Sequence, residues 1–231
     1  MAFQGITIDP KVAADYPAAK IGWLIADVKV RKNHPHVDAL KKSLAQNLAE
    51  RGVTEENISA QPDIAKWRAV YGAMGVKPSK YRSSLEALTR RVVKGQEMWS
   101  VSSVVDCYNC VSVLTSLPMG AHDTSRVEGT MTLRYGREGE KFLPLGDGGE
   151  TVSVDPKNIL YADESKVCCW LWNHRDTRLA AVTEETEEAL FIVDTAFPPH
   201  LTSIRQGLKT LAEHLERIGC TPKESSVIET L

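Results

Sequence analysis

The most concentrated group of chemically capable side chains is the stretch Trp170–Asp176, which reads WLWNHRD. Its tryptophans stand at alternate positions, so in a strand Trp170 and Trp172 would lie on one face. The polar residues that follow where such a strand should end are Asn173, His174, Arg175 and Asp176. An aromatic wall beside a few convergent polar groups suits a small organic ligand with a polar end. The alternative is a pair of core tryptophans followed by a charged turn.

A second polar group joins a helix to the segment that follows it. Asp106 and Asn109 are one turn apart, so they would share one face of a helix over residues 103–116. We expect residues 117–123 (LPMGAHD) to form a Pro/Gly turn that delivers His122 next to a carboxylate. A histidine, whose ordinary pKa is about 6.5, can act as a base when a carboxylate orients it. The alternative is that Asp106 and Asn109 are hydrogen-bonded structural groups.

The one concentrated basic run lies between Lys77 and Lys94. Its residues that we expect to contact RNA are Lys80, Arg82, Arg90, Arg91 and Lys94. Such a run can bind a phosphate backbone, because lysine and arginine neutralise phosphates and release counterions. The alternative is a solvated helix face that carries ion pairs four residues apart, such as Glu86 with Arg90.

The cysteines and the N-terminus indicate a reducing compartment. Met1–Pro10 has no basic segment followed by an apolar one, so we expect no signal peptide. The five cysteines are an odd number, which without an export signal predicts reduced thiols in the cytoplasm. Cys107 and Cys110 form a C-x-x-C pair, but no second pair or nearby histidine completes a metal site. We therefore expect no metal, no cofactor and, because the apolar stretches are short, no membrane span.

The composition is that of an ordinary globular chain. Charged residues make up 25% and hydrophobic residues 42% of the 231 residues, which excludes disordered, collagenous and fibrous chains. Lysine and arginine total 28 against 30 acidic residues, so the net charge is −2. A protein with this charge does not bind nucleic acid through its whole surface, so any RNA contact must be local.

The elements that must position these residues are helices first, then strands, then a helix. Predicted helices cover 38–51, with Asp38 as the N-cap, 63–74, 103–116, 201–218 and a segment from Ser83 or Ser84 to Val93. Predicted strands cover 21–30, 130–135, 141–145, 151–154, 159–161, 167–172 and 190–193. This order predicts an α+β fold with a largely antiparallel sheet flanked by helices. We expect residues 1–62 to be a strand–helix extension packed on a main domain of residues 63–219, with 220–231 as a frayed tail.

Several of these segments resemble the tRNA-editing domain, made of domains B three and B four, of the bacterial phenylalanyl-tRNA synthetase beta subunit. The segments that match it in order and spacing are Ser83–Arg91, Val104–Asn109, Leu117–Asp123, Gly129–Arg134, Ile159–Asp163, Trp170–Asp176 and Val182–Thr186. The match covers roughly residues 65–195, and the pattern is most similar to free-standing relatives of that domain. This chain departs from the synthetase pattern at two positions. Gly120 stands where the synthetase has a histidine. Asp176 is the only residue here that could take the place of the acidic residue with which the synthetase recognises tyrosine.

The resemblance implies an α+β fold with two lobes around a pocket, and a stand-alone hydrolase that cleaves the ester of a misacylated tRNA. In this reading Asn109 and Asn173 are oxyanion or water donors, and His122 or His174 is the base. The residues that would bind the aminoacyl group or the ribose and phosphate beside it are Gly120, Trp170, Trp172, Arg175, Asp176 and Thr183. The implied partners are the tRNA 3′ end, held by the local basic patch, and an amino acid or aminoacyl group. The alternative is a non-catalytic module of the same fold that binds tRNA, an amino acid or another small metabolite.

Overall fold

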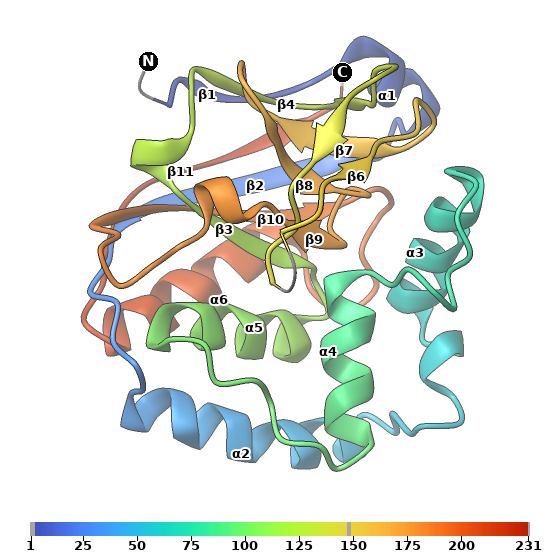
Figure 1. The fold of residues 1–231 in the computed structure, drawn as a ribbon. Coiled ribbons are helices and arrows are strands. Elements are labelled where there is room, and N and C mark those ends of the chain that lie inside the picture. Colours follow the sequence, from blue (N-terminus) through green and yellow to red (C-terminus); the bar gives the residue numbers. More distant parts are fainter. Residues whose placement is uncertain (1–2, 147–148, 231) are drawn as a thin grey trace.

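The structure, a computed structural model, describes residues 3–146 and 149–230. Residues 1, 2 and 231, which fall in the predicted N-terminal extension and tail, lie outside the described residues, as do 147 and 148. The chain forms two main sheets, and most of its helices lie below the second sheet in the view of Figure 1. Within the described ranges no helix is both long enough and apolar enough to cross a membrane.

The first sheet has five strands in the order β1-β4-β7-β8-β9. Their bounds are β1 (Gly5–Ile8), β4 (Thr130–Tyr135), β7 (Ile159–Ala162), β8 (Val167–Trp170) and β9 (Arg175–Asp176). β1 runs parallel to β4, and the other neighbours are antiparallel. Met131 and Leu133 of β4 alternate with half-buried threonines and are buried in the core, as the period of a strand requires. A separate pair is formed by β5 (Lys141–Phe142) and β6 (Val152–Ser153).

The second sheet has four antiparallel strands in the order β11-β2-β10-β3. Their bounds are β11 (Thr221–Glu229), β2 (Lys20–Asp27), β10 (Glu188–Thr195) and β3 (Met119–Asp123). Alternate residues of β10 face opposite cores: Leu190 and Ile192 pack with residues of the first sheet, whereas Phe191 and Val193 pack with the helices. β2, from the N-terminal segment, is therefore an inner strand of a sheet that is buried on both faces.

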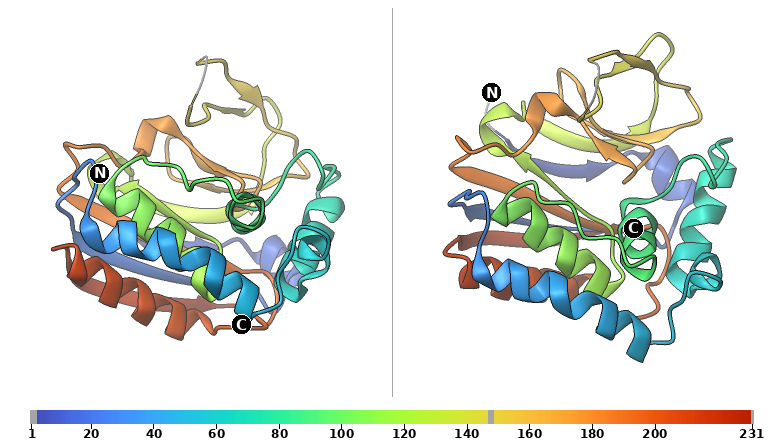
Figure 2. Two further views of the ribbon diagram at one scale, coloured as in Figure 1. Left: turned by 90° about the horizontal axis from the view of Figure 1, so that it is seen from below. Right: turned by 60° about the horizontal axis from the view of Figure 1, so that its bottom comes forward.

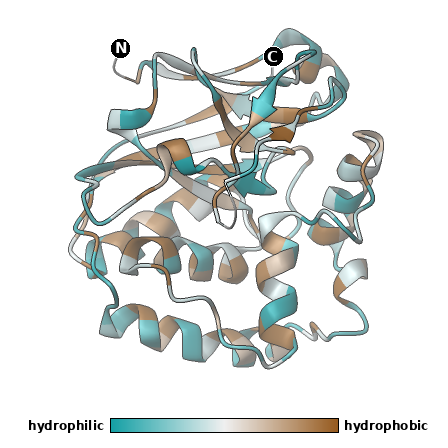
Figure 3. Cartoon of the chain, in the orientation of Figure 1, coloured by the Kyte–Doolittle hydropathy of each residue, from teal (hydrophilic) through white to brown (hydrophobic). Residues whose placement is uncertain are grey.

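The helices are α1 (Pro10–Asp15), α2 (Pro35–Glu50), α3 (Pro62–Ala73), α4 (Ser84–Val93), α5 (Ser103–Thr115) and α6 (Ile204–Arg217). α5 and α6 cover the face of the second sheet that is turned away from the first sheet, and α2 lies against α5 (Figure 2). Figure 3 shows hydrophobic and hydrophilic positions alternating along these helices, as expected for helices buried on one side.

Two glycines permit the close approach of α6 to its neighbours. A Cβ atom at Gly22 of β2 would lie 2.8 Å from Leu208 Cδ1, and one at Gly207 would lie 2.5 Å from Leu117 Cδ1. Both separations are shorter than carbon atoms tolerate. The close packing of α6 on β2 and on Leu117 therefore depends on glycine at both positions.

The predicted α+β class, with largely antiparallel strands flanked by helices, is confirmed. The predicted cap of α4 is also present, because the Ser83 hydroxyl accepts a hydrogen bond of 3.2 Å from the Glu86 backbone N–H. The prediction of Asp38 as an N-cap is wrong: α2 begins at Pro35, and His34 caps it. Proline suits the first helical position because its φ is already helical and it has no N–H to satisfy.

Two segments that we expected to be irregular are strands. Residues 119–123, predicted as part of a turn, form β3 and pair with β10, with Met119 and Ala121 buried against the helices. Residues 221–229, predicted as part of a frayed tail, form β11 at the edge of the second sheet. β11 is mostly exposed and polar, so its stability comes from backbone pairing with β2, which its own sequence does not reveal.

Candidate functional site

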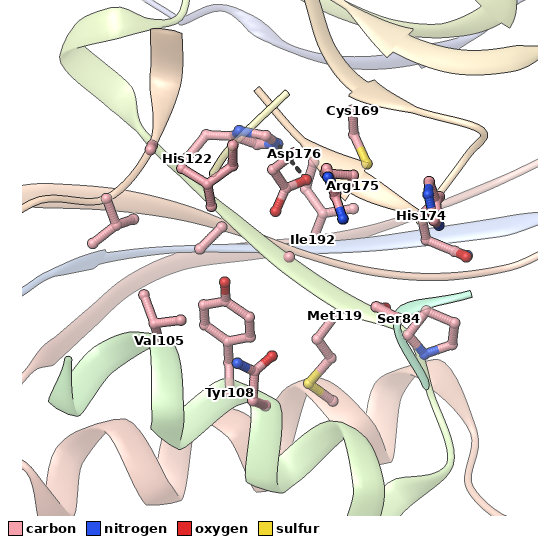
Figure 4. A pocket seen from close by; sticks show the side chains of 18 of the residues that line it. Ser84, Val105, Tyr108, Met119, His122, Cys169, His174, Arg175, Asp176 and Ile192 are labelled. Carbon is pink, nitrogen blue, oxygen red and sulfur yellow. Dashed lines mark ion pairs between the residues drawn. The ribbon is translucent and has the colours of Figure 1, made fainter. Parts of the chain in front are cut away.

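A cavity of about 640 Å³ lies where β3 and β9, the edge strands of the two sheets, approach each other above α5 (Figure 4). The predicted site residues that line it are Asn109, Gly120, His122, Trp172, Asn173, His174, Arg175 and Asp176. Trp170 and Thr183 lie outside this lining. The fold thus brings the two polar groups singled out in the sequence to one place.

The expectation that Trp170 and Trp172 share a strand face is wrong. β8 ends at Trp170, and the next two residues, Leu171 and Trp172, have φ values of 52° and 65°. This left-handed turn, which is uncommon for residues other than glycine, redirects the chain toward β9. It places Trp172 in the core, where its ring meets Trp67 edge to face at 5.4 Å. The core alternative therefore describes Trp172, although part of it reaches the cavity wall.

Asn173 belongs to a buried hydrogen-bond network. Its amide donates to Asp194 Oδ1 at 3.0 Å, and its carbonyl oxygen accepts from the Tyr71 hydroxyl at 3.1 Å. The Tyr161 hydroxyl donates to the other Asp194 oxygen at 2.9 Å. Both polar ends of Asn173 are therefore engaged within the protein, and its position on the cavity wall is fixed.

Asp194 is the site residue that sequence reasoning missed most clearly. It lines the cavity from β10 and is fully buried, and burial raises its pKa to about 7 although Asn173 and Tyr161 donate hydrogen bonds to it. The available signal was an acid that directly follows the apolar run Leu190–Val193. A carboxyl group with this pKa can gain or lose a proton near neutral pH.

His122 and Asp176 both line the cavity and face each other, with 3.9 Å between His122 Nε2 and Asp176 Oδ1 (Figure 4). Burial lowers the pKa of His122, so the imidazole is neutral at pH 7. Its Nδ1 atom has no hydrogen-bond partner among the described residues. A Cβ atom at Gly120 would lie 3.2 Å from Asp176 Oδ2, so the absence of a side chain at position 120 makes room for the Asp176 carboxylate.

α5 supplies two further polar groups to the cavity, Tyr108 and Asn109. The Tyr108 hydroxyl points toward β3 (Figure 4), and burial raises its pKa, so it stays protonated and can donate a hydrogen bond. Tyr108 was not predicted as a site residue, although it precedes Asn109. Asp106 is structural, since it pairs with Lys41 at 2.7 Å and accepts from the Val101 N–H.

The His174 side chain is held by a hydrogen bond to the backbone. Its Nδ1 lies 2.7 Å from the Arg82 carbonyl oxygen, which can only accept, so Nδ1 carries the proton. The ring lies edge-on to Tyr81 and Trp170, and burial lowers its pKa. Its Nε2 is thus left as the atom that can accept a hydrogen bond.

Much of the predicted RNA-binding run is engaged in contacts within the protein. The buried Glu86 carboxylate accepts ion pairs from Arg68 at 2.8 Å, Arg90 at 3.1 Å and Arg82 at 3.6 Å. Lys94 pairs with Glu55 at 3.0 Å. The alternative of ion pairs four residues apart therefore describes Arg90, whereas Lys94 pairs with a residue distant in the sequence. Lys80 and Arg82 line a second cavity of about 340 Å³ beside the first.

Neither a metal nor a reactive thiol is indicated in the part of the chain that the structure describes. Within residues 3–146 and 149–230, no three His, Cys, Asp or Glu side chains cluster closely enough to hold a metal ion. The five cysteines are free and buried. Cys169 lines the cavity, but burial raises its pKa well above the ordinary value, so it remains a weakly nucleophilic thiol.

Comparisons with known proteins agree on one family. The model of the B3/4 domain family matches residues 66–227. The phenylalanine–tRNA ligase beta subunit of Chromobacterium violaceum is 34% identical over 80 residues, which is 35% of this chain and 10% of that subunit. The beta subunit of Cutibacterium acnes is 35% identical over 78 residues, or 34% of this chain and 9% of that subunit. These alignments thus span about a tenth of the curated relatives.

A solved structure is also similar. It is an N-terminal fragment of the phenylalanyl-tRNA synthetase beta subunit from Pyrococcus horikoshii. It aligns with a TM-score of 0.47 and 12% identity, over 94% of this chain and 50% of that one.

Proposed function

The chain belongs to the B3/4 domain family, and from that premise we propose that it is a stand-alone editing-type hydrolase that cleaves the aminoacyl ester of a misacylated tRNA. The observation that carries the proposal is the meeting of His122, Asp176 and Tyr108 around one cavity of about 640 Å³. A cavity of this size can enclose an aminoacyl group and the sugar to which it is esterified. The free cysteines support a cytoplasmic location, which is part of the proposal.

His122 is the proposed general base. Because burial keeps its imidazole neutral at pH 7, it can accept a proton from a water molecule that attacks the ester carbonyl. Asp176 stabilises the imidazolium that results. The proton then passes to the ribose oxygen as the carbon–oxygen bond of the ester breaks, which releases a free amino acid and the tRNA hydroxyl.

Tyr108 and Asn109 are the proposed donors to the oxyanion. Both line the cavity from α5, and the raised pKa of Tyr108 keeps its hydroxyl protonated while negative charge develops on the substrate. Asn173 is held by Asp194 and Tyr71, so its proposed role is to fix the cavity wall. An aminoacyl ester is already activated, so positioning of the water can supply much of the rate.

The test is ester loss from a panel of tRNAs charged with cognate and non-cognate amino acids, with this chain as the sole protein present. We expect at least one misacylated tRNA to lose its ester faster than in buffer. His122→Asn should lower that rate by about 100-fold or more, the usual contribution of a general base. His200→Asn is the matched control, because His200 is exposed and lies outside the cavity lining. An unchanged rate in His122→Asn would remove His122 as the base.

A second candidate function is a non-catalytic module that binds an amino acid or the end of a tRNA. The observation that favours it is the separation of 3.9 Å between His122 and Asp176, which is longer than a hydrogen bond between a base and its orienting group. If no ester is lost faster than in buffer, while a free amino acid raises the melting temperature, this second function replaces the first.

A further inference from the structure

The second cavity adjoins the first and has a distinct charge. The residues that line both cavities are Ser84, Trp99, Asn109, His174 and Arg175. The cations in the lining of the second cavity are Lys80, Arg82 and Arg175, and no Asp or Glu is among the described residues that line it. In a chain with a net charge of −2, this is a local concentration of positive charge that attracts an anion.

Trp99 stands at the border of the two cavities and is 49% exposed. The Arg91 guanidinium lies 4.8 Å from the centre of its indole ring, and Arg91 Nε also donates to the Glu97 carbonyl. Arg91, which we expected to contact RNA, thus holds an exposed aromatic ring at the cavity mouth. Large aromatic side chains are normally buried, so a half-exposed tryptophan at a cationic cavity indicates a ligand surface.

One polar atom of the second cavity's lining residues is buried without a partner. Ser84 Oγ has no hydrogen-bond partner among the described residues, whereas Arg82 Nε lies 3.6 Å from Glu86 Oε1 in the ion pair described above. A buried hydroxyl is usually paired, so Ser84 Oγ is available to an acceptor such as a phosphate oxygen.

We propose that this second cavity is a nucleotide subsite, in which the Trp99 indole stacks on a base while Lys80, Arg82 and Arg175 hold the adjoining phosphate. The inference rests on the proposed function and names how the substrate's RNA end is held: the last nucleotides lie in the second cavity and the ester lies in the first. Stacking on an aromatic ring tolerates any base, so the subsite reads a single-stranded end by shape and charge.

Direct binding tests the subsite without reference to catalysis. The probes are a 5′-phosphorylated CCA trinucleotide, adenosine and inorganic phosphate, each titrated calorimetrically into the protein. We expect the trinucleotide to bind more tightly than either of the others, and more weakly as salt rises. Trp99→Ala should weaken its binding about tenfold or more, whereas Trp99→Phe, which keeps a stacking face, should retain most of it.

The cation contribution needs its own variants. Lys80→Ala combined with Arg175→Ala should weaken trinucleotide binding and flatten its salt dependence. The matched control is Arg205→Ala combined with Lys209→Ala, two exposed cations of α6 outside both cavity linings, which should bind as the unaltered protein does. Trinucleotide binding that is undetectable, or that is equal in the Trp99 variants and the unaltered protein, would overturn the inference.

A nucleotide-free substrate separates this inference from the proposed function. Trp99→Ala should lower kcat/KM for an aminoacyl-tRNA more than for the ethyl ester of the same amino acid. If neither ester is hydrolysed but the trinucleotide binds through Trp99, the hydrolase proposal fails and the subsite stands. If the aminoacyl-tRNA is hydrolysed at equal rates by the unaltered protein and Trp99→Ala, the subsite fails and the hydrolase stands.

Discussion

Single residues decide which carboxylates can act in the cavity. Asp176 is 19% exposed at its side chain and faces His122, whereas Asp194 is fully buried behind Asn173 and Tyr161. The two acids therefore differ in environment, and burial raises the pKa of Asp194 to about 7. Gly120 belongs to the same arrangement, because the Asp176 carboxylate occupies the space above it.

Gly120→Ala tests whether the position of Asp176 matters. The added methyl group would lie 3.2 Å from Asp176 Oδ2 and push the carboxylate away from its present position. We expect ester hydrolysis to fall about tenfold or more, while the free energy of unfolding changes by less than about 1 kcal/mol. Gly72→Ala is the matched control, since a Cβ there has no neighbour within 4 Å. Full activity in Gly120→Ala would show that Asp176 tolerates the shift.

Asp194→Asn tests the raised pKa through stability. The pKa is 3.8 ordinarily and about 7 in the folded protein, so the folded state holds the proton more tightly. The contribution of Asp194 to stability is therefore full below pH 3.8 and is lost as pH rises to 7. Relative to Asp194→Asn, the unaltered protein should lose on the order of 4 kcal/mol of unfolding free energy between pH 4 and 7. A difference that is constant with pH would contradict the raised pKa.

At the scale of elements, α4 positions much of the site through one buried acid. Glu86 in the first turn of α4 is 1% exposed and gathers three guanidiniums, of which Arg68 comes from α3. This joins α3 to α4 and fixes the start of α4, where Ser84 lines both cavities. The basic run was therefore visible in the sequence, and the i,i+4 spacing indicated the pair of Glu86 with Arg90. The sequence did not indicate that Glu86 also pairs with Arg68 of α3.

Glu86→Gln should destabilise the fold, because it leaves three guanidiniums without the charge that neutralises them. We expect a loss of about 2 to 3 kcal/mol in the free energy of unfolding, measured by urea denaturation. Glu55→Gln, which removes the exposed pair with Lys94, should cost less than about 1 kcal/mol. Equal losses in the two variants would mean that burial does not increase the contribution of Glu86 to the free energy of unfolding.

At the scale of the whole molecule, the last strand completes the second sheet. β11 pairs along the whole of β2, and Lys223 bridges Asp27 and Glu188 of two neighbouring strands at 2.5 and 2.9 Å. Without β11, β2 would be an exposed edge strand with unpaired backbone groups. The C-terminal segment, which we predicted as a frayed tail, thus covers the backbone edge of β2.

Deletion of residues 221–231 should therefore lower the melting temperature and promote association between copies of the protein. Thermal unfolding and light scattering measure the two effects. Removal of residues 230–231 alone is the control, because it leaves every residue of β11 in place. An unchanged melting temperature and a monodisperse sample after the long deletion would contradict a structural role for β11.

The sequence by itself determined the elements whose signals are local. Helical spacing, the Ser83 cap and the apolar positions of β4 and β7 report interactions within a few residues, so α4, α5, β4 and β7 were predicted close to their true bounds. The polar clusters around Asn109 and Asn173 were also visible, because buried or crowded polar groups are unusual wherever they occur. Their chemical roles stay predictions.

Only the tertiary structure decided which of these side chains meet. Asp194, Tyr108 and Tyr161 join His122 and Asp176 because β10, α5, β7, β3 and β9 converge, and no short-range pattern encodes that convergence. The left-handed turn at Leu171 and Trp172 sends one tryptophan into the core, and β11 exists only because β2 offers it a free edge. Contacts between distant residues depend on the path of the whole chain, so the site became defined only when that path was known.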